Sequence, residues 1–194
     1  MADSQLRLNL SAGESLPTGL CWLIEKGYLT LWSANQGDGP TPLGIWGPGE
    51  LVMPSLLGLE AVQLLSLTAV TVREWSASPD DEHRCLEQIV HQLATLLQLA
   101  QIRRADQRLH ALLRWLGERF GDMHAEGVTL SFNAINLTHR NLADLAGLTR
   151  VTVTKTLIRF RQEGILSRHG QDDVLLLRAE RTPPGGQPGS PPAD

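Results

Sequence analysis

The chain has 194 residues, 42% of them hydrophobic, which is enough to bury the core of one large or two small domains. Its net charge of −4 conceals an asymmetry, because residues 1–100 carry 4 basic and 11 acidic side chains whereas residues 101–169 carry 11 basic and 6 acidic ones. A basic block on an acidic chain is typical of a contact with a polyanion. No apolar run reaches the roughly 18–20 residues of a membrane span, and residues 1–10 do not resemble a signal peptide. We therefore predict a cytoplasmic protein with no membrane partner.

Cysteine usage gives no sign of a metal or disulfide framework. Cys21 and Cys85 are the two cysteines of the chain, and they form neither a metal-ligand spacing nor a disulfide pattern. We interpret both as small apolar residues of a reducing compartment and predict no metal ion and no cofactor. The chain also lacks a nucleophile elbow, a P-loop and a dinucleotide-binding fingerprint, so we predict that it is not an enzyme.

Residues 5–75 have the pattern of short strands separated by turns. Residues 20–24 and 28–32 are rich in β-formers and are separated by a tight turn, and further strands are predicted at 43–46 and 64–75. Several short strands at regular spacing suggest a barrel or a jelly roll. We assign residues 1–78 to this domain.

A long helix follows. The run Ser78-Pro79-Asp80-Asp81 has the cap, proline and acidic residues that favour a helix start, and apolar residues recur at spacings of three and four up to residue 102. The pattern predicts one helix over about 80–104, within a segment of 79–104. Its apolar face is broader than the roll needs, which favours a second copy of the chain as partner. The predicted dimer interface comprises Leu86, Ile89, Leu93, Leu96 and Ala100.

The segment 137–170 has the layout of a helix-turn-helix. Thr138 and Thr149 are plausible N-caps, and Gly147 stands where the chain must turn tightly between two helices. In the second helix, three residues face inward at helical spacing: Val153, Leu157 and Phe160. That leaves four residues outward near its start, where a recognition helix meets base edges: Arg150, Val151, Thr154 and Lys155.

The flanking segments complete a winged domain over residues 105–180. Apolar residues predict a helix that ends at Gly121, and residues 128–132 have the composition of a strand. Residues 165–166 and 174–177 flank a polar turn, which predicts a hairpin in the place of a wing. By composition, residues 181–194 form a disordered tail.

Two stretches, LTHRNLADLAGLTRVTVTKTL and RADQRLHALLRWLGERFG, resemble the Crp/Fnr superfamily, and the former is most similar to the cyanobacterial nitrogen-control (NtcA-like) type. The resemblance extends over about residues 7–178. It implies an α+β fold with an N-terminal β-roll, a jelly roll like the cyclic-nucleotide-binding domain, then a long dimerisation helix and a C-terminal winged helix-turn-helix. It also implies a homodimeric, sequence-specific transcription regulator that binds a palindromic site in double-stranded DNA, with RNA polymerase as a further partner.

The resemblance also implies roles for individual residues. Arg150 can donate two hydrogen bonds to guanine, Val151 can pack on a thymine methyl group, and Lys155 reaches a base acceptor or a phosphate. The positions that hold the DNA backbone are Thr138, His139, Arg140, Thr149, Thr152 and His169. For Arg159 and Arg161, a solvated helix face is the preferred interpretation.

The effector half departs from the family pattern. Residues 51–72 contain neither Arg nor Lys, so a cyclic-nucleotide phosphate would lie beside Glu60 without a cation, and we predict that cyclic AMP does not bind. The chain has too few cysteines for an iron–sulfur cluster, and no histidine stands out as a haem ligand. Binding of 2-oxoglutarate is neither excluded nor required by the sequence. The small-molecule effector is therefore left unknown. The alternative function is a protein-interaction module with a degenerate β-roll and little DNA binding.

Overall fold

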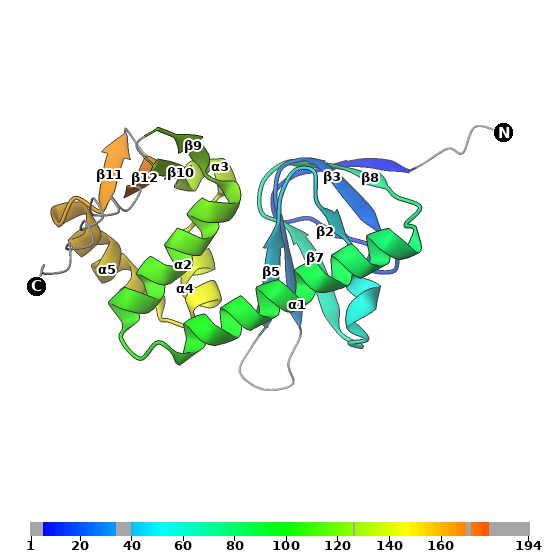
Figure 1. Cartoon of the computed structure of the whole chain (residues 1–194), viewed down its shortest axis with the longest axis horizontal. Helices are drawn as coiled ribbons and strands as arrows, with labels where there is room; N and C mark the ends of the chain where they lie inside the picture. The colour runs from blue at the N-terminus through cyan, green and yellow to red at the C-terminus, as the bar shows by residue number, and fades with distance from the viewer. Residues whose placement is uncertain (1–5, 34–39, 126, 170–171, 179–194) are drawn as a thin grey trace, which may run out of the picture.

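The computed structural model describes residues 6–33, 40–125, 127–169 and 172–178. Two lobes lie at either end of one long helix, as Figure 1 shows. The first lobe contains the N-terminal strands, and the second contains the remaining helices and a small sheet. The predicted tail over 181–194 lies outside the described residues.

The N-terminal lobe is a roll of two antiparallel four-stranded sheets. One sheet has the order β1 (Arg7–Leu10), β8 (Val70–Glu74), β3 (Trp22–Lys26) and β6 (Leu51–Val52), and the other has the order β2 (Ser15–Leu16), β7 (Val62–Ser66), β4 (Leu29–Ser33) and β5 (Thr41–Trp46). The single strand predicted over 64–75 is wrong. The chain bends at residues 67–69 to leave one sheet for the other, and Thr68 Oγ1 accepts the Tyr28 amide at 2.9 Å in that bend.

Large apolar side chains fill the space between the two sheets. Trp22 and Trp46 lie there fully buried, surrounded by aliphatic residues from four strands: Ile24, Leu29, Leu31, Leu64 and Val72. The indole of Trp22 donates to the Pro17 carbonyl oxygen at 2.9 Å, so its one polar atom is paired. A short 3₁₀ helix, Pro54–Leu57, follows β6.

Helix α1 (Pro79–Gln101) begins at the predicted cap. Ser78 and Asp81 form a capping box, and the pKa of Asp81 falls to about 2 because its carboxylate accepts hydrogen bonds from the Ser78 backbone, the Ser78 hydroxyl and the Trp75 indole. The helix ends at Gln101, earlier than the predicted 104, because Ile102 is extended and packs against the second lobe. Within the described ranges, no helix is long and apolar enough to cross a lipid bilayer.

The second lobe is a winged domain. Its elements are α2 (Ala105–Phe120), β9 (Asp122–His124), β10 (Gly127–Ser131), α3 (Phe132–Ile135), α4 (His139–Ala146), α5 (Arg150–Gln162), β11 (Leu166–His169) and β12 (Asp172–Arg178). The strands form one antiparallel sheet of order β11-β12-β10-β9. The predicted strand over 128–132 ends one residue early, since Phe132 begins α3 after the Ser131 cap.

The two lobes share a contact centred on Arg119 of α2. Its guanidinium donates to the Ile45 carbonyl oxygen at 2.9 Å and pairs with Glu50 at 2.8 Å. The ring of Phe120 meets Tyr28 of the roll edge-on. Helix α2 is therefore fixed to the β5–β6 turn of the roll.

We expect Arg119→Met to lower the free energy of unfolding by about 1.5–3 kcal/mol, because Ile45 and Glu50 lose a charged donor in a largely buried place. Urea unfolding followed by tryptophan fluorescence measures this change. Arg114→Met is the matched control, since Arg114 and Glu118 form a pair that is more than half exposed, and its loss should cost under about 0.5 kcal/mol. Equal losses in the two variants would show that the Arg119 contact has no special weight.

Candidate nucleic-acid interface

Local sequence signals set the geometry of the α4–α5 unit. Thr138 Oγ1 accepts the Asn141 amide and Thr149 Oγ1 accepts the Thr152 amide, both at 3.1 Å, so the two predicted N-caps are confirmed. Gly147 adopts the left-handed conformation with φ 59°, which ends α4 and turns the chain into α5. The predicted tight turn is therefore confirmed as well.

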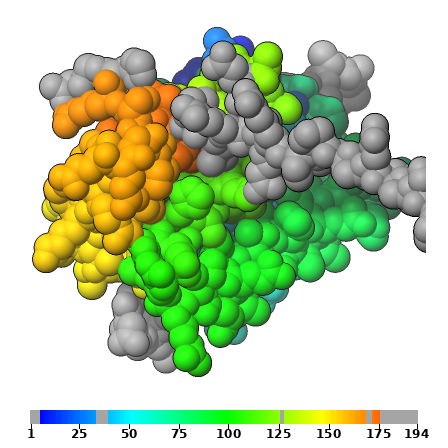
Figure 2. Space-filling model, turned by 60° about the vertical axis from the view of Figure 1, so that its left-hand side comes forward, coloured from blue at the N-terminus to red at the C-terminus, as the bar shows by residue number. Residues whose placement is uncertain are grey.

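Helix α5 separates a buried face from an exposed start. Val153, Leu157 and Phe160 are buried against α2 and α4, as predicted. Arg150, Val151 and Lys155 are exposed near the first turns; the side chain of Val151 is 62% exposed although it is apolar. In Figure 2 the orange surface that includes α5 lies on the outer left side of the molecule.

Thr154 does not belong with these exposed residues, which corrects the predicted set. Its side chain is half-buried, and its hydroxyl donates to the Arg150 carbonyl oxygen and contacts His139 Nδ1, each at 2.9 Å. Because a hydroxyl has one proton, Thr154 must accept from Nδ1–H of His139. The neutral imidazole of His139 therefore presents a lone pair on Nε2, and only the protonated ring can donate to a phosphate there.

The other residues predicted to contact the DNA backbone lie at the edges of the α4–α5 unit. Thr138 and Arg140 are exposed at the start of α4, where Arg140 lies 3.9 Å from Asp144. Thr149 and Thr152 share a contact of 2.9 Å between their hydroxyl oxygens at the start of α5. His169 is the last residue of β11, and its side chain lies outside the described part of the structure.

The wing is held to α5 by charge. Arg161 forms a bidentate pair with Asp173 of β12, and this hydrogen-bonded guanidinium lowers the pKa of Asp173. Next to it, the Asp172 carboxylate accepts the Ser131 hydroxyl and the Asn133 amide at the start of α3. Arg161 therefore does not lie on a purely solvated helix face, which corrects the sequence interpretation.

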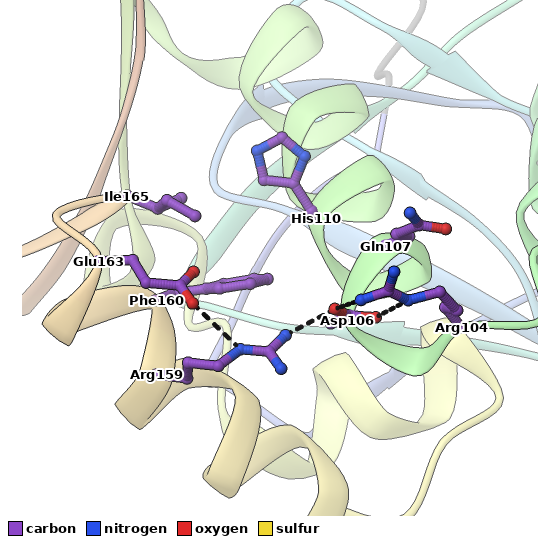
Figure 3. A pocket seen from close by; sticks show the side chains of 8 residues that line it. All are labelled: Arg104, Asp106, Gln107, His110, Arg159, Phe160, Glu163 and Ile165. Carbon is purple, nitrogen blue, oxygen red and sulfur yellow. Dashed lines mark hydrogen bonds and ion pairs between the residues drawn. The ribbon is translucent and has the colours of Figure 1, made fainter.

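A second charged contact fixes the same C-terminal part of α5 to α2. Asp106 of α2 accepts Arg104 at 2.9 Å and Arg159 at 2.8 Å, and Arg159 also lies 3.5 Å from Glu163. Figure 3 shows this chain of charges along an open pocket of about 340 Å³. The hydrogen bond from Arg104 is the main reason that the pKa of Asp106 falls to about 2. Arg159 thus secures α5 against α2.

Arg108 is a structural residue that sequence reasoning missed. Its guanidinium donates to the Ile102 carbonyl oxygen at 2.9 Å and to the carbonyl oxygens of Ala146 and Gly147, both at 3.2 Å. These acceptors are far apart in the sequence, so no local pattern indicates the contact. One side chain therefore joins the α1–α2 link to the turn of the helix-turn-helix.

The residues predicted for a dimer interface do not all lie on one face of α1. Leu86 and Ala100 are exposed, and Ile89 is buried in the core of the roll. Leu93 and Leu96 are half-buried, Leu93 against the core of the roll and Leu96 against the larger core that includes the winged domain. Two apolar residues outside the predicted set are more exposed, namely Val90 at 57% and Leu97 at 64%.

Comparison with known proteins agrees with this architecture. Residues 107–181 match the model of the Crp-like helix-turn-helix domain. The chain is 36% identical over 178 residues to the regulatory protein CysR of Synechococcus elongatus, which covers 91% of this chain and 85% of that protein. The chain belongs to the Crp/Fnr family of transcription regulators. The interaction-module alternative is accordingly not favoured.

Two further relatives extend the comparison. The cyclic AMP receptor protein of Thermus thermophilus is 28% identical over 175 residues, which cover 81% of this chain and 75% of that protein. The structure of FixK2 from Bradyrhizobium japonicum superposes with a TM-score of 0.71 at 16% identity, covering 89% and 92% of the two chains. The latter likeness confirms the predicted fold of β-roll, long helix and winged helix-turn-helix.

We expect acid to destabilise the winged domain through His139. Burial, followed by the charge of Arg161, lowers the pKa of His139 from its ordinary value of 6.5. Above pH 6.5 neither state carries the proton, and as the pH falls from 6.5 toward the lower folded pKa the unfolded chain alone gains it. Stability is therefore lost across that window.

Urea unfolding at about pH 7.5 and about pH 5.5, on either side of the ordinary histidine range, tests this prediction. In His139→Gln, whose amide can still donate to Thr154, the loss of stability at the lower pH should shrink. His83→Gln, an exposed site on α1, should retain the full loss. Identical pH responses in wild type and His139→Gln would contradict the prediction.

Proposed function

We propose that the protein binds a palindromic duplex as a homodimer, placing the start of α5 in the major groove, and that it does so without a cyclic nucleotide. The observation that carries this proposal is the exposed set Arg150, Val151 and Lys155 at a capped helix start. Helix starts of this kind enter the major groove in helix-turn-helix proteins.

The chemistry of the three side chains suggests what each one reads. Arg150 is suited to the O6 and N7 atoms of guanine through two hydrogen bonds, and Val151 is suited to a thymine methyl group. Lys155, about one turn further, supplies a single charge for a base acceptor or a phosphate. An exposed valine beside two cations gains nothing from contact with water alone, so its position favours an apolar contact with a partner such as a thymine methyl group.

The backbone contacts follow from the same placement. Arg140 offers an exposed guanidinium, and the hydroxyl of Thr138 retains a proton to donate after accepting a backbone amide. Thr149 and Thr152 share one hydrogen bond between their hydroxyls, so one of the two has a proton left to donate to a phosphate. His139 joins this set only when its ring is protonated. His169 and RNA polymerase stay predictions of the family resemblance.

The dimer proposal rests on a stripe along α1, which we define as Leu86, Val90, Leu93, Leu97 and Ala100. These residues alternate at spacings of four and three, the pattern with which two helices pack side by side. Leu97 and Val90 are the most exposed large apolar side chains of the stripe. This stripe differs from the predicted set in that the exposed Val90 and Leu97 take the places of the buried Ile89 and the half-buried Leu96.

Two features of the roll support independence from a cyclic nucleotide. Tryptophan and aliphatic side chains occupy the space between its sheets. The nearby cations Arg7 and Arg73 both pair with Glu25, at 2.7 and 3.3 Å. A buried phosphate would therefore lack a cation and would have to displace packed side chains.

We expect Arg150→Ala to relax sequence preference at one symmetric base pair, at about 1–3 kcal/mol of discrimination per half-site. Selection of binding sites from randomised duplexes measures this preference. If the selected motif is unchanged in Arg150→Ala, α5 is not the recognition helix.

Arg140→Ala is the matched comparison for a backbone contact. It should weaken binding to all sequences alike, and it should lower the slope of log affinity against log salt by about one for each phosphate that the variant no longer neutralises. A change of the selected motif in this variant would assign Arg140 to base reading instead.

For the dimer, we expect Leu97→Glu to produce monomers and to weaken operator binding, because it places a charge in each half of an apolar seam. Light scattering at micromolar concentration measures the mass. Leu59→Glu is the control, since Leu59 is an exposed leucine of the roll outside α1. A monomeric wild-type protein would overturn this part of the proposal.

We also expect isothermal titration calorimetry to detect no binding of cyclic AMP, and gel-shift affinity to be the same with and without it. Micromolar binding of the nucleotide, or an operator complex that forms only in its presence, would contradict this expectation.

A further inference from the structure

Three sulfur-bearing side chains meet at the junction of the roll and α1. Cys21 immediately precedes β3, Met53 immediately follows β6, and Cys85 lies in the first turns of α1. They form one buried cluster with relative exposures of 7%, 9% and 3%. The two cysteines of the chain, which are far apart in the sequence, are thus brought together.

The positions of the two thiols are fixed by their backbones. The Cys21 carbonyl oxygen accepts the Trp75 amide at 2.9 Å, and Cys85 is held by the helix. Cys21 and Cys85 lie in the same buried cluster, and the neighbouring Cys85 side chain, followed by burial, raises the pKa of the Cys21 thiol. The sulfurs are therefore neighbours without a covalent bond, and both cysteines are free thiols.

Apolar side chains cover much of the cluster. Leu51, Leu56, Trp75 and Ala77 pack against it. The nearby carboxylate of Asp81 is already engaged by Ser78, Trp75 and Arg84. Among the residues that the structure describes, no group of three or more His, Cys, Asp and Glu could hold a metal, so any metal here must rely on sulfur.

Solvent reaches the cluster from one side. An open cleft of about 410 Å³ is lined by Cys85 together with Asp81, Arg84, Gln88 and Trp75. Arg84 also lines this cleft, where its guanidinium pairs with Asp81 at 2.6 Å. A small ion can thus approach Cys85 first and then meet Cys21 and Met53 behind it.

We propose that Cys21, Cys85 and Met53 form a binding site for a soft monovalent metal ion, Cu(I). Thiolate and thioether sulfurs select this ion over harder cations. Each thiol loses its proton to solvent, each thiolate donates an electron pair to the ion, and no oxidation state changes. The resulting bis-thiolate complex has a charge of −1, and the Met53 sulfur is the weaker third ligand.

Titration of the reduced, full-length protein with Cu(I) under anaerobic conditions tests the site. Bicinchoninate serves as the competing chelator, and DNA is absent. We expect one Cu(I) per chain, with a thiolate-to-copper absorption in the ultraviolet. Zn(II) should compete poorly, because its structural sites have four protein ligands and this site offers two thiolates and one thioether. A wild-type protein that fails to withdraw Cu(I) from the chelator would overturn the proposal.

Variants separate this site from adventitious binding. Cys85→Ser and Cys21→Ser should each abolish the absorption, and Met53→Leu should retain one ion per chain but release it at lower chelator concentration. Met123→Leu, an exposed methionine on β9, should behave as wild type. If a serine variant does not fold, the comparison of the two methionine variants still decides. Equal release by Met53→Leu and wild type, or one ion per two chains, would contradict this three-sulfur site.

Discussion

Helix α2 is fixed along its inner face and at both of its ends. The position of the recognition surface on α5 depends on these contacts. Its inner face carries the fully buried leucines Leu109, Leu112, Leu113 and Leu116, on which the other helices of the winged domain pack. Its last turn is fixed to the roll by Arg119. Its first turn is fixed to α5 through Asp106 and to the helix-turn-helix turn through Arg108. Apolar burial stabilises the domain, and the charged contacts at the two ends of α2 define its orientation.

The sequence was most informative where structure is decided locally. The caps Ser78, Thr138 and Thr149 and the turn at Gly147 were all placed correctly, because each depends on a side chain within three residues or on the freedom of glycine. The winged fold followed from such signals in order. The strand predicted over 64–75 was wrong because alternation continues through a bend between two sheets, and alternation does not specify which sheet a residue joins.

Contacts between distant segments could not be predicted in the same way. The apolar residues of α1 recur at spacings of three and four around more than one face, so the pattern could not separate Ile89, which packs in the roll, from Val90, which is exposed. Likewise, helical spacing places Thr154 on the outward side of α5, but its contact with His139 of α4 is not visible in the local sequence. The pairing of Cys21 with Cys85 has no local signature, since it arises from where α1 lies on the roll.

The short link between α1 and α2 restricts how the winged domain can move relative to α1. Only residues 102–104 separate the two helices, and Arg108 binds the link and the helix-turn-helix turn with the same guanidinium. In a two-fold dimer, the separation of the two α5 helices would then be a fixed property of the protein and not one that adapts to the DNA. Each base pair added between half-sites turns one of them by about 35° and moves it by about 3.4 Å along the duplex. Such a dimer would discriminate operators by the length of their spacer as well as by their bases.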